Sequence, residues 1–204
     1  LLGRVVLSHS GNNQLFVVEE EVFIAGAEPE FAASYGSLAS PATTMVSELN
    51  HVGGIWGAGD IVAAPLECSE AEECDVGYNE IWFFRADEFE LSHIQTVRLD
   101  WSQGESNPFY ENAAATAFFR LINHHYLLVV AGKQSQLYFY VSNRPELSPD
   151  TEWRFAGEWY PDCVFEYDGS VPMPESCFGG VSSLAAITQC DGRMFLLALQ
   201  GMGD

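Results

Sequence analysis

The chain has 204 residues, and its 8 lysine and arginine residues against 29 aspartate and glutamate residues give a formal net charge of −21. A surface this acidic repels phosphate groups, so it argues against nucleic acid and anionic membranes as partners and favours cations, basic proteins or neutral ligands. Apolar residues make up 48% of the sequence and aromatic residues 13%, which favours a folded globular chain over a disordered one. No apolar run approaches the roughly 18 residues of a membrane-spanning helix, so membrane insertion is not expected.

Apolar runs bounded by polar turns predict β-strands along most of the chain. The clearest pair lies at 126–141, YLLVVAGKQSQLYFYV, where two apolar runs flank a short polar turn, as in a buried β-hairpin. Similar pairs are expected at 4–18 and 60–84, and further strands are expected before and after the pairs. In chain order, the predicted strands are 4–10, 14–18, 21–24, 54–56, 60–64, 79–84, 94–99, 116–119, 127–131, 137–141, 153–156, 183–187 and 193–199.

The strand pairs recur at a nearly constant spacing. Ile61, Leu127 and Met194 occupy equivalent places in their strands and lie 66 and 67 residues apart. The second strand of each pair keeps this spacing once about ten extra residues around 68–78 are allowed for. Similarity at a fixed long period is typical of a repeat fold.

Four antiparallel strands per repeat, with the middle two most apolar, form the blade of a β-propeller. We therefore predict an all-β fold, a β-propeller of four-stranded antiparallel blades, with blades at 51–100 and 113–160 and partial blades at 1–27 and 180–204. The chain resembles secreted bacterial β-propeller proteins in its hairpins and in two glycine-rich blade starts, HVGGI from His51 and FGGVSS from Phe178. The resemblance is generic and indicates no particular family.

A closed propeller typically has roughly four to eight blades. Two complete blades and two partial ones fall short of that number, so we expect the chain to be part of a larger propeller, completed by further polypeptide or by a partner subunit. A β-sandwich or a β-helix is the alternative architecture.

The cysteines indicate an oxidising compartment. Cys68 with Cys74 and Cys163 with Cys177 are the natural pairs for loop-closing disulfides, although spacing alone does not fix which cysteines pair, and Cys190 is left over. Together with the acidic surface, these pairs predict a secreted, periplasmic or cell-surface protein.

The long connections of the predicted blades are expected on one face. In an antiparallel blade, the turn between the middle two strands and the link to the next blade leave from the same end. Every long segment of the chain is either such a turn or such a link: 27–50, 68–78, 101–112 and 160–179. Long loops on a rigid scaffold usually carry binding or catalysis. Exposed aromatic rings beside hydrogen-bonding groups suit a sugar, and carboxylates suit hard cations such as calcium. The predicted ligand-binding residues are His51, at the start of an innermost strand, and Trp101, Glu105, Phe109, Tyr110, Glu111, Tyr160 and Asp162.

We therefore predict an extracytoplasmic binding module that recognises a glycan or a protein through its loop-bearing face, with calcium as a candidate cofactor. A binding role is favoured over an enzymatic one, and no catalytic residue is assigned. One alternative is a hydrolase such as a glycosidase, which needs two carboxylates about 5–10 Å apart; Glu67, Glu111 and Asp162 are the acids nearest the expected central channel. The other alternative is an architectural subunit of a surface assembly.

Overall fold

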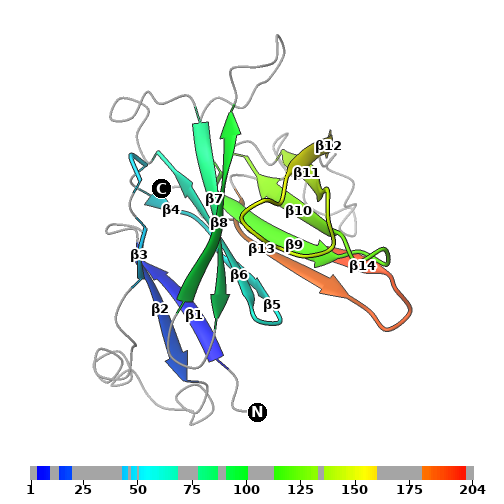
Figure 1. Cartoon of the computed structure of the whole chain (residues 1–204), viewed down its shortest axis with the longest axis horizontal. Coiled ribbons are helices and arrows are strands. Elements are labelled where there is room, and N and C mark those ends of the chain that lie inside the picture. The colour runs from blue at the N-terminus through cyan, green and yellow to red at the C-terminus, as the bar shows by residue number, and fades with distance from the viewer. Residues whose placement is uncertain are drawn as a thin grey trace, which may run out of the picture.

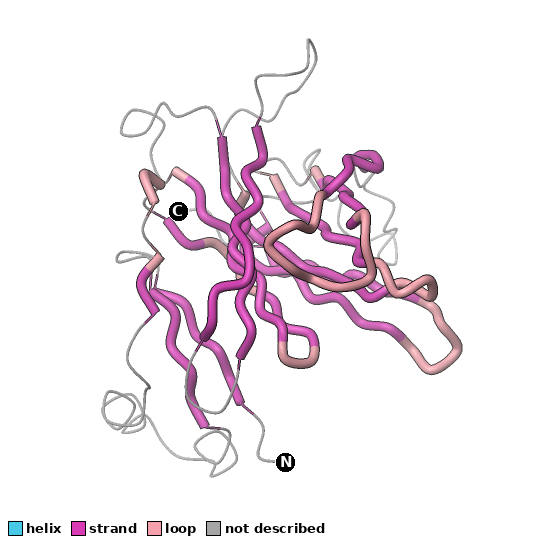
Figure 2. Tube along the Cα trace, viewed as in Figure 1, coloured by secondary structure: helices cyan, strands magenta, loops and turns pink. Residues whose placement is uncertain are grey.

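The computed structural model describes residues 4–9, 14–19, 43–45, 47–49, 51–68, 78–86, 91–100, 113–132, 136–159 and 181–200. These residues form fourteen β-strands and no helix (Figures 1 and 2). Accordingly, the described part of the chain offers no helix that could cross a membrane. In chain order the strands are β1 (Arg4–His9), β2 (Gln14–Glu19), β3 (Thr43–Thr44), β4 (His51–Val52), β5 (Trp56–Ala58), β6 (Ile61–Glu67), β7 (Tyr78–Ala86), β8 (Leu91–Asp100), β9 (Ala115–Arg120), β10 (Tyr126–Ala131), β11 (Leu137–Ser142), β12 (Trp153–Trp159), β13 (Val181–Thr188) and β14 (Met194–Gln200).

The strands form four sheets, here named A to D in chain order. Sheet A has the strand order β1-β2-β3, sheet B has β4-β6-β7-β8 with β5 also on β6, sheet C has β12-β11-β10-β9, and sheet D has β13-β14. Every strand pairing within these sheets is antiparallel. The prediction of an all-β fold with four-stranded antiparallel sheets is therefore confirmed.

The strands expected within 51–100 and 113–160 are present, with one difference. The first strand of sheet B is interrupted: β4 and β5 pair with opposite halves of β6, and Gly53, Gly54 and Ile55 lie between them. The strand predicted at 54–56 is therefore wrong at Gly54 and Ile55, and only Trp56 lies in a strand. The strand predicted at 21–24 lies outside the described residues. The prediction that 27–50 is a loop is wrong at β3, which pairs with β2.

Consecutive sheets pack face to face, and each pair of sheets encloses its own layer of core side chains. Between sheets A and B, Leu15 packs with Val62 and Phe84 of sheet B. Between sheets C and D, Val129 packs with Leu184. Successive residues of a strand point to opposite faces, so the inner sheets B and C serve two layers at once. This explains why their middle strands are apolar at nearly every position.

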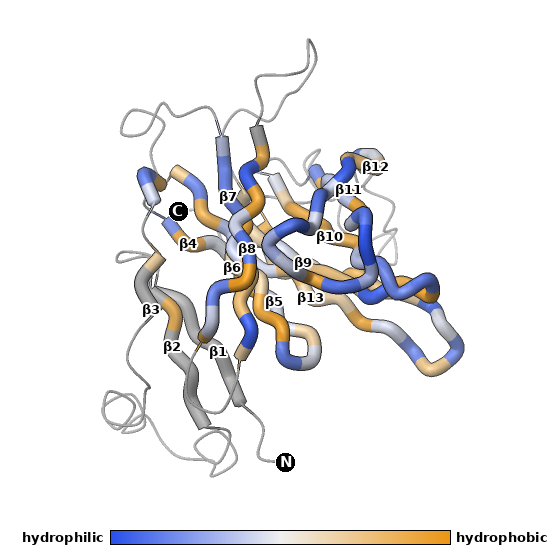
Figure 3. The backbone as a smooth tube through the Cα atoms, viewed as in Figure 1, coloured by the Kyte–Doolittle hydropathy of each residue, from blue (hydrophilic) through white to orange (hydrophobic). Residues whose placement is uncertain are grey.

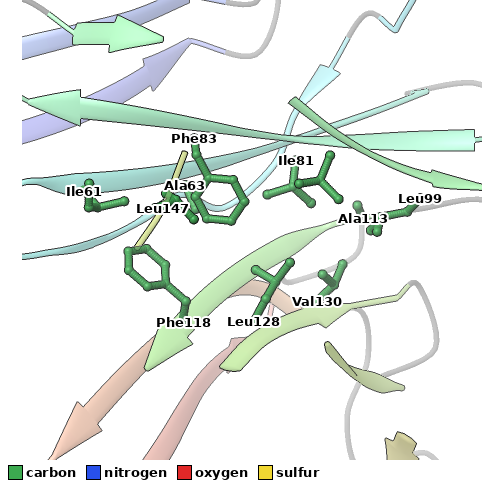
Figure 4. Packing of buried hydrophobic residues seen from close by; sticks show 11 residues of the cluster. Ile61, Ala63, Ile81, Phe83, Leu99, Ala113, Phe118, Leu128, Val130 and Leu147 are labelled. Carbon is green, nitrogen blue, oxygen red and sulfur yellow. The ribbon is translucent and has the colours of Figure 1, made fainter. Parts of the chain in front are cut away.

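The layer between sheets B and C shows this packing at close range (Figure 4). Ile81 and Phe83 of sheet B face Phe118 and Leu128 of sheet C, and all four side chains are at most 2% exposed. The rings of Phe83 and Phe118 meet edge to face at 6.0 Å between centroids. Burying a side chain of this size stabilises the fold by roughly 1.5–3 kcal/mol. In Figure 3, hydrophobic residues lie along β6, β9 and β13, in the interior of the molecule.

The first strands of sheets B, C and D meet at the centre of this arrangement. Gly54 forms a parallel bridge with Ala115 of β9, its amide donating to the Ala114 carbonyl at 2.7 Å. A Cβ atom on Gly54 would lie 2.4 Å from the carbonyl oxygen of Ser182 in β13, and one on Gly53 would lie 2.3 Å from that of Ala114. The two glycines therefore permit a backbone contact that any side chain would prevent.

Sheets B and C also share a backbone irregularity. A β-bulge lies between Phe83 and Phe84 where β7 pairs with β8, and another lies between Phe139 and Tyr140 where β11 pairs with β12. These positions are 56 residues apart, the same spacing as Ile81 and Leu137 in the predicted repeat. The two sheets thus repeat in backbone detail as well as in apolar pattern.

Replacing Gly54 by alanine is expected to destabilise the protein by about 2–3 kcal/mol, because the new methyl group would push the first strands apart. Gly57→Ala is the matched control: its Cβ would meet its nearest neighbour at 3.6 Å, an ordinary contact. Unfolding in urea, followed by tryptophan fluorescence, measures both variants. Equal stability of the two variants would contradict the close contact of Gly54 with β9 and β13.

Candidate functional site

The strand ends next to the long segments define one end of sheet B. In sheet B, Glu67 at the end of β6 pairs with His51, and Tyr78 at the start of β7 pairs with Asp100 at the end of β8. These four residues adjoin the segments 27–50, 68–78 and 101–112, and we call this the loop end of the sheet.

The corresponding end of sheet C lies on the same side. Ala131 at the end of β10 pairs with Ala115 and with Leu137, so the strand ends next to 133–135 and 101–112 lie together. Because the bridge between Gly54 and Ala115 is parallel, the first strands of sheets B and C run in the same direction. The loop ends of the two sheets therefore coincide, as the sequence analysis expects for their flanking segments.

At the loop end, the layer between sheets B and C changes from apolar to polar. Glu67 and Asn79 are 5% and 2% exposed, and strand alternation places them on the face of sheet B that carries Ile81 and Phe83. Gln136 and Tyr138 are 7% and 1% exposed. They lie on the opposing face of sheet C, since Tyr138 pairs with the core residue Val130. With the half-buried His51, we call His51, Glu67, Asn79, Gln136 and Tyr138 the polar cluster.

Two contacts within the polar cluster involve the Tyr138 hydroxyl and the His51 ring. The Tyr138 hydroxyl donates to Oε1 of Gln136 at 3.0 Å. Nε2 of His51 lies 3.8 Å from Oε1 of Glu67, which is beyond hydrogen-bonding distance. Burial lowers the pKa of His51 below its usual value, so the imidazole is neutral near pH 7.

Asn79 is the member of the cluster that most needs a partner. Its Nδ2 is buried and has no hydrogen-bond partner among the described residues. A buried donor left unsatisfied costs roughly 1–3 kcal/mol. An amide retained at this cost is suited to donate to an oxygen atom brought by a ligand.

The opposite face of sheet B carries polar groups of a different character. Glu80 accepts hydrogen bonds from Ser47 Oγ at 2.8 Å and from Trp82 Nε1 at 2.9 Å. The Tyr78 hydroxyl donates to Glu48 at 3.1 Å. These groups satisfy one another and hold the segment around 47–49 against sheet B, so their role is structural.

Only part of the polar cluster was predicted from the sequence. His51, one of the predicted ligand-binding residues, and Glu67, one of the acids of the hydrolase alternative, belong to it. Asn79, Gln136 and Tyr138 were missed, although a polar residue at a core-facing position of an apolar strand is a usable signal. The other predicted ligand-binding residues lie outside the described residues: Trp101, Glu105, Phe109, Tyr110, Glu111, Tyr160 and Asp162.

The end of sheet C opposite to the loop end is less plain than predicted. The connection between β11 and β12, residues 143–152, is a ten-residue loop that was not among the predicted long connections. The Thr151 side chain links it internally, donating to the Glu146 carbonyl at 3.0 Å and accepting from the Ser148 amide at 2.9 Å. A cavity of about 610 Å³ lies beside this loop, lined by Asn123, His125, Val141, Ser142, Asn143, Glu152, Trp153 and Arg154.

The groups around this cavity are largely engaged with one another. The Trp153 ring stacks on Phe83 at 5.2 Å between centroids, so one of its faces is covered. Asn143 donates to Glu152 at 3.1 Å, and Nδ1 of His125 lies 2.6 Å from the Ser142 carbonyl oxygen. These contacts build the loop, and the polar cluster is the better candidate for binding.

The described residues bear on the calcium and disulfide predictions. They contain no group of three or more histidine, cysteine, aspartate or glutamate side chains arranged to hold a metal ion. Cys68 is disulfide-bonded, and Cys190 is a free, exposed thiol. Cys74, Cys163 and Cys177 lie outside the described residues, so both predicted pairings stay predictions.

Comparison with known proteins gives no relative for this chain: no family model, curated protein or solved structure matches it.

If the predicted pairs form, alkylation of the denatured, unreduced protein labels one cysteine, Cys190, and reduction releases four more. Mass spectrometry of peptides from the unreduced protein is expected to find Cys68 joined to Cys74 and Cys163 joined to Cys177. Labelling of three or more cysteines before reduction would contradict the prediction.

The pKa of His51 also gives a pH-dependent prediction. Its pKa is about 6.5 in the unfolded chain and lower in the folded one, so below about pH 6.5 the unfolded state binds more protons and stability falls. His51→Gln removes this contribution, and the variant is expected to lose less stability than the parent between pH 7 and 5. Urea unfolding at each pH measures the difference. Equal losses in the two proteins would show that burial does not hold His51 neutral.

Proposed function

We propose that the chain is part of a β-propeller and that it acts as an extracytoplasmic binding module for a neutral glycan, held at the loop end between sheets B and C. Three observations support the propeller. The sheets pack face to face in chain order, their first strands gather around Gly54, and sheets B and C repeat a bulge at equivalent positions. The disulfide at Cys68 supports the extracytoplasmic setting.

The polar cluster is the observation that carries the proposed binding function. It combines a carboxylate acceptor in Glu67, an amide donor in Asn79 and further polar groups in His51, Gln136 and Tyr138, all at the end from which the long segments leave. A sugar hydroxyl both donates and accepts hydrogen bonds, so a glycan matches such a mixed set. The net charge of −21 disfavours acidic ligands, which is the reason for proposing a neutral one.

A hydrolase is the second candidate, and the burial of Glu67 favours it. A carboxylate that is 5% exposed beside a neutral imidazole is suited to proton transfer. Glycoside hydrolysis needs a second carboxylate about 5–10 Å away, and Glu111 and Asp162 are the acids proposed for that role. Release of reducing ends from a bound glycan would favour this candidate over a binding module.

Asn79→Leu tests the binding function. The purified protein is first screened on an array of neutral glycans, and the strongest ligand is then titrated by calorimetry. Because leucine has the same number and branching of side-chain heavy atoms as asparagine but no donor, the variant is expected to bind at least ~10-fold more weakly, the loss of one buried hydrogen bond, while its resistance to urea stays the same or rises.

Asp60→Asn is the matched control, since Asp60 is exposed at the β5–β6 turn, away from the loop end. It is expected to bind as the parent does. The proposal fails if no neutral glycan binds, or if Asn79→Leu binds as tightly as Asp60→Asn.

A further inference from the structure

The apolar layer between sheets B and C ends beside the polar cluster. Leu99 pairs with Asn79 in the register of β7 and β8, and Leu99, Ala113 and Val130 are buried members of this layer. In Figure 4, these three side chains lie toward one end of the layer and Ile61 lies toward the other. A ligand group that reaches the polar cluster therefore also meets apolar side chains.

Two amide donors belong to this end of the layer, one from each sheet. In sheet B, Nδ2 of Asn79 is buried and finds no hydrogen-bond partner in the described part of the chain. In sheet C, Oε1 of Gln136 accepts from the Tyr138 hydroxyl, which leaves Nε2 as the donor of that amide. Both side chains are buried, so each donor gains most from an acceptor that a ligand brings.

Glu67 adds an acceptor to these donors. It lies on β6, the strand beside β7, and on the same face of sheet B as Asn79. A carboxylate has roughly four lone-pair positions, so it can accept from a ligand in addition to a protein donor. An anionic ligand group would meet both this carboxylate and the net charge of −21, so a neutral group is favoured.

An acetamido group matches this combination of two donors, an acceptor and an apolar surface. Its carbonyl oxygen has two lone pairs and can accept from two amide donors, its N–H can donate to a carboxylate, and its methyl group is apolar. A sugar hydroxyl has no methyl group to place on the apolar side chains. The carboxylate of an acidic sugar offers enough acceptors but brings a negative charge.

We propose that the polar cluster recognises the 2-acetamido group of a neutral sugar. The carbonyl oxygen of this group accepts from Asn79 and Gln136, and its N–H donates to Glu67. Its methyl group rests on the end of the apolar layer, over Leu99 and Ala113. The inference rests on the proposed glycan-binding function and names the class of sugar that the site takes.

The selectivity of such a site comes from what other sugars leave unmet. A site built to form hydrogen bonds discriminates against an analogue that leaves its buried polar groups unpaired. A sugar with a hydroxyl at carbon 2 brings a shorter group than the acetamido sugar does, and it places a polar atom against the apolar end of the layer. The donor of Asn79, buried and without a partner in the empty site, is the group that such a sugar satisfies least well.

Pairs of methyl glycosides that differ only at carbon 2 test the inference. The pairs are N-acetylglucosamine with glucose, N-acetylgalactosamine with galactose, and N-acetylmannosamine with mannose. NMR titration of the parent protein gives the dissociation constant of each sugar. In at least one pair, the acetamido sugar is expected to bind at least ~10-fold more tightly than its partner, the effect of one hydrogen bond and one buried methyl group.

Asn79→Leu is expected to lower this preference to about 4-fold or less, the contribution of the methyl group alone. Its urea midpoint verifies that the variant is folded. Asp60→Asn, at the exposed β5–β6 turn, is the matched control and is expected to keep the preference of the parent.

The outcomes separate this inference from the proposed function. Equal binding within every pair, no binding of any acetamido sugar, or an unchanged preference in folded Asn79→Leu would each overturn the acetamido assignment. The proposed function survives these results if the parent still binds a neutral glycan on the array. A parent that binds no neutral glycan at all overturns both.

Discussion

The contact between the first strands of sheets B, C and D sets the arrangement of everything else. At Gly54 the chain approaches β9 closely enough for backbone hydrogen bonds and β13 closely enough to exclude a Cβ atom. Sheets held together along one line must spread apart on either side of it, and side chains fill the wedges between them. The three core layers are therefore a result of the central contact, and their residues alternate because each sheet borders two wedges.

The same arrangement explains where polar chemistry can be placed. A sheet buried on both faces has few positions at which a polar side chain can reach solvent or a ligand, and those positions are at the strand ends. Glu67 and Asn79 occupy the last and second positions of their strands. Farther along the same strands, at Ala63 and Phe83, the layer is apolar and fully closed. The polar cluster is thus located at the strand ends, where polar side chains can reach solvent or a ligand. It adjoins the long connecting segments, the part of a fold that tolerates sequence change most readily.

Much of the fold could be predicted because the apolar pattern is local and repeated. The continuous apolar runs of β6 and β10 and the glycine pair before β5 can be recognised without knowing what they contact. The two-residue strand β3 is too short to have a pattern, and the break between β4 and β5 depends on contacts with distant strands. For the same reason Asn79, Gln136 and Tyr138 were missed: they come together only through the register of two sheets and the packing of one upon the other. The loop at 143–152 was not among the predicted long connections, and its fold depends on the contacts of Thr151 within it.

The paired bulges of sheets B and C change the side to which each outer strand presents its apolar residues. In β8 the extra residue, Ile94, reverses the side to which the strand's hydrophobic groups point: Leu91 belongs to the layer on one side and Val97 to the layer on the other, although both positions are odd. Ala156 occupies the corresponding place in β12. Few side chains match between these two outer strands, yet both retain the same defect at the same point. The two breaks mark equivalent positions of the repeat, so a self-alignment of the chain is best anchored at Ile94 and Ala156.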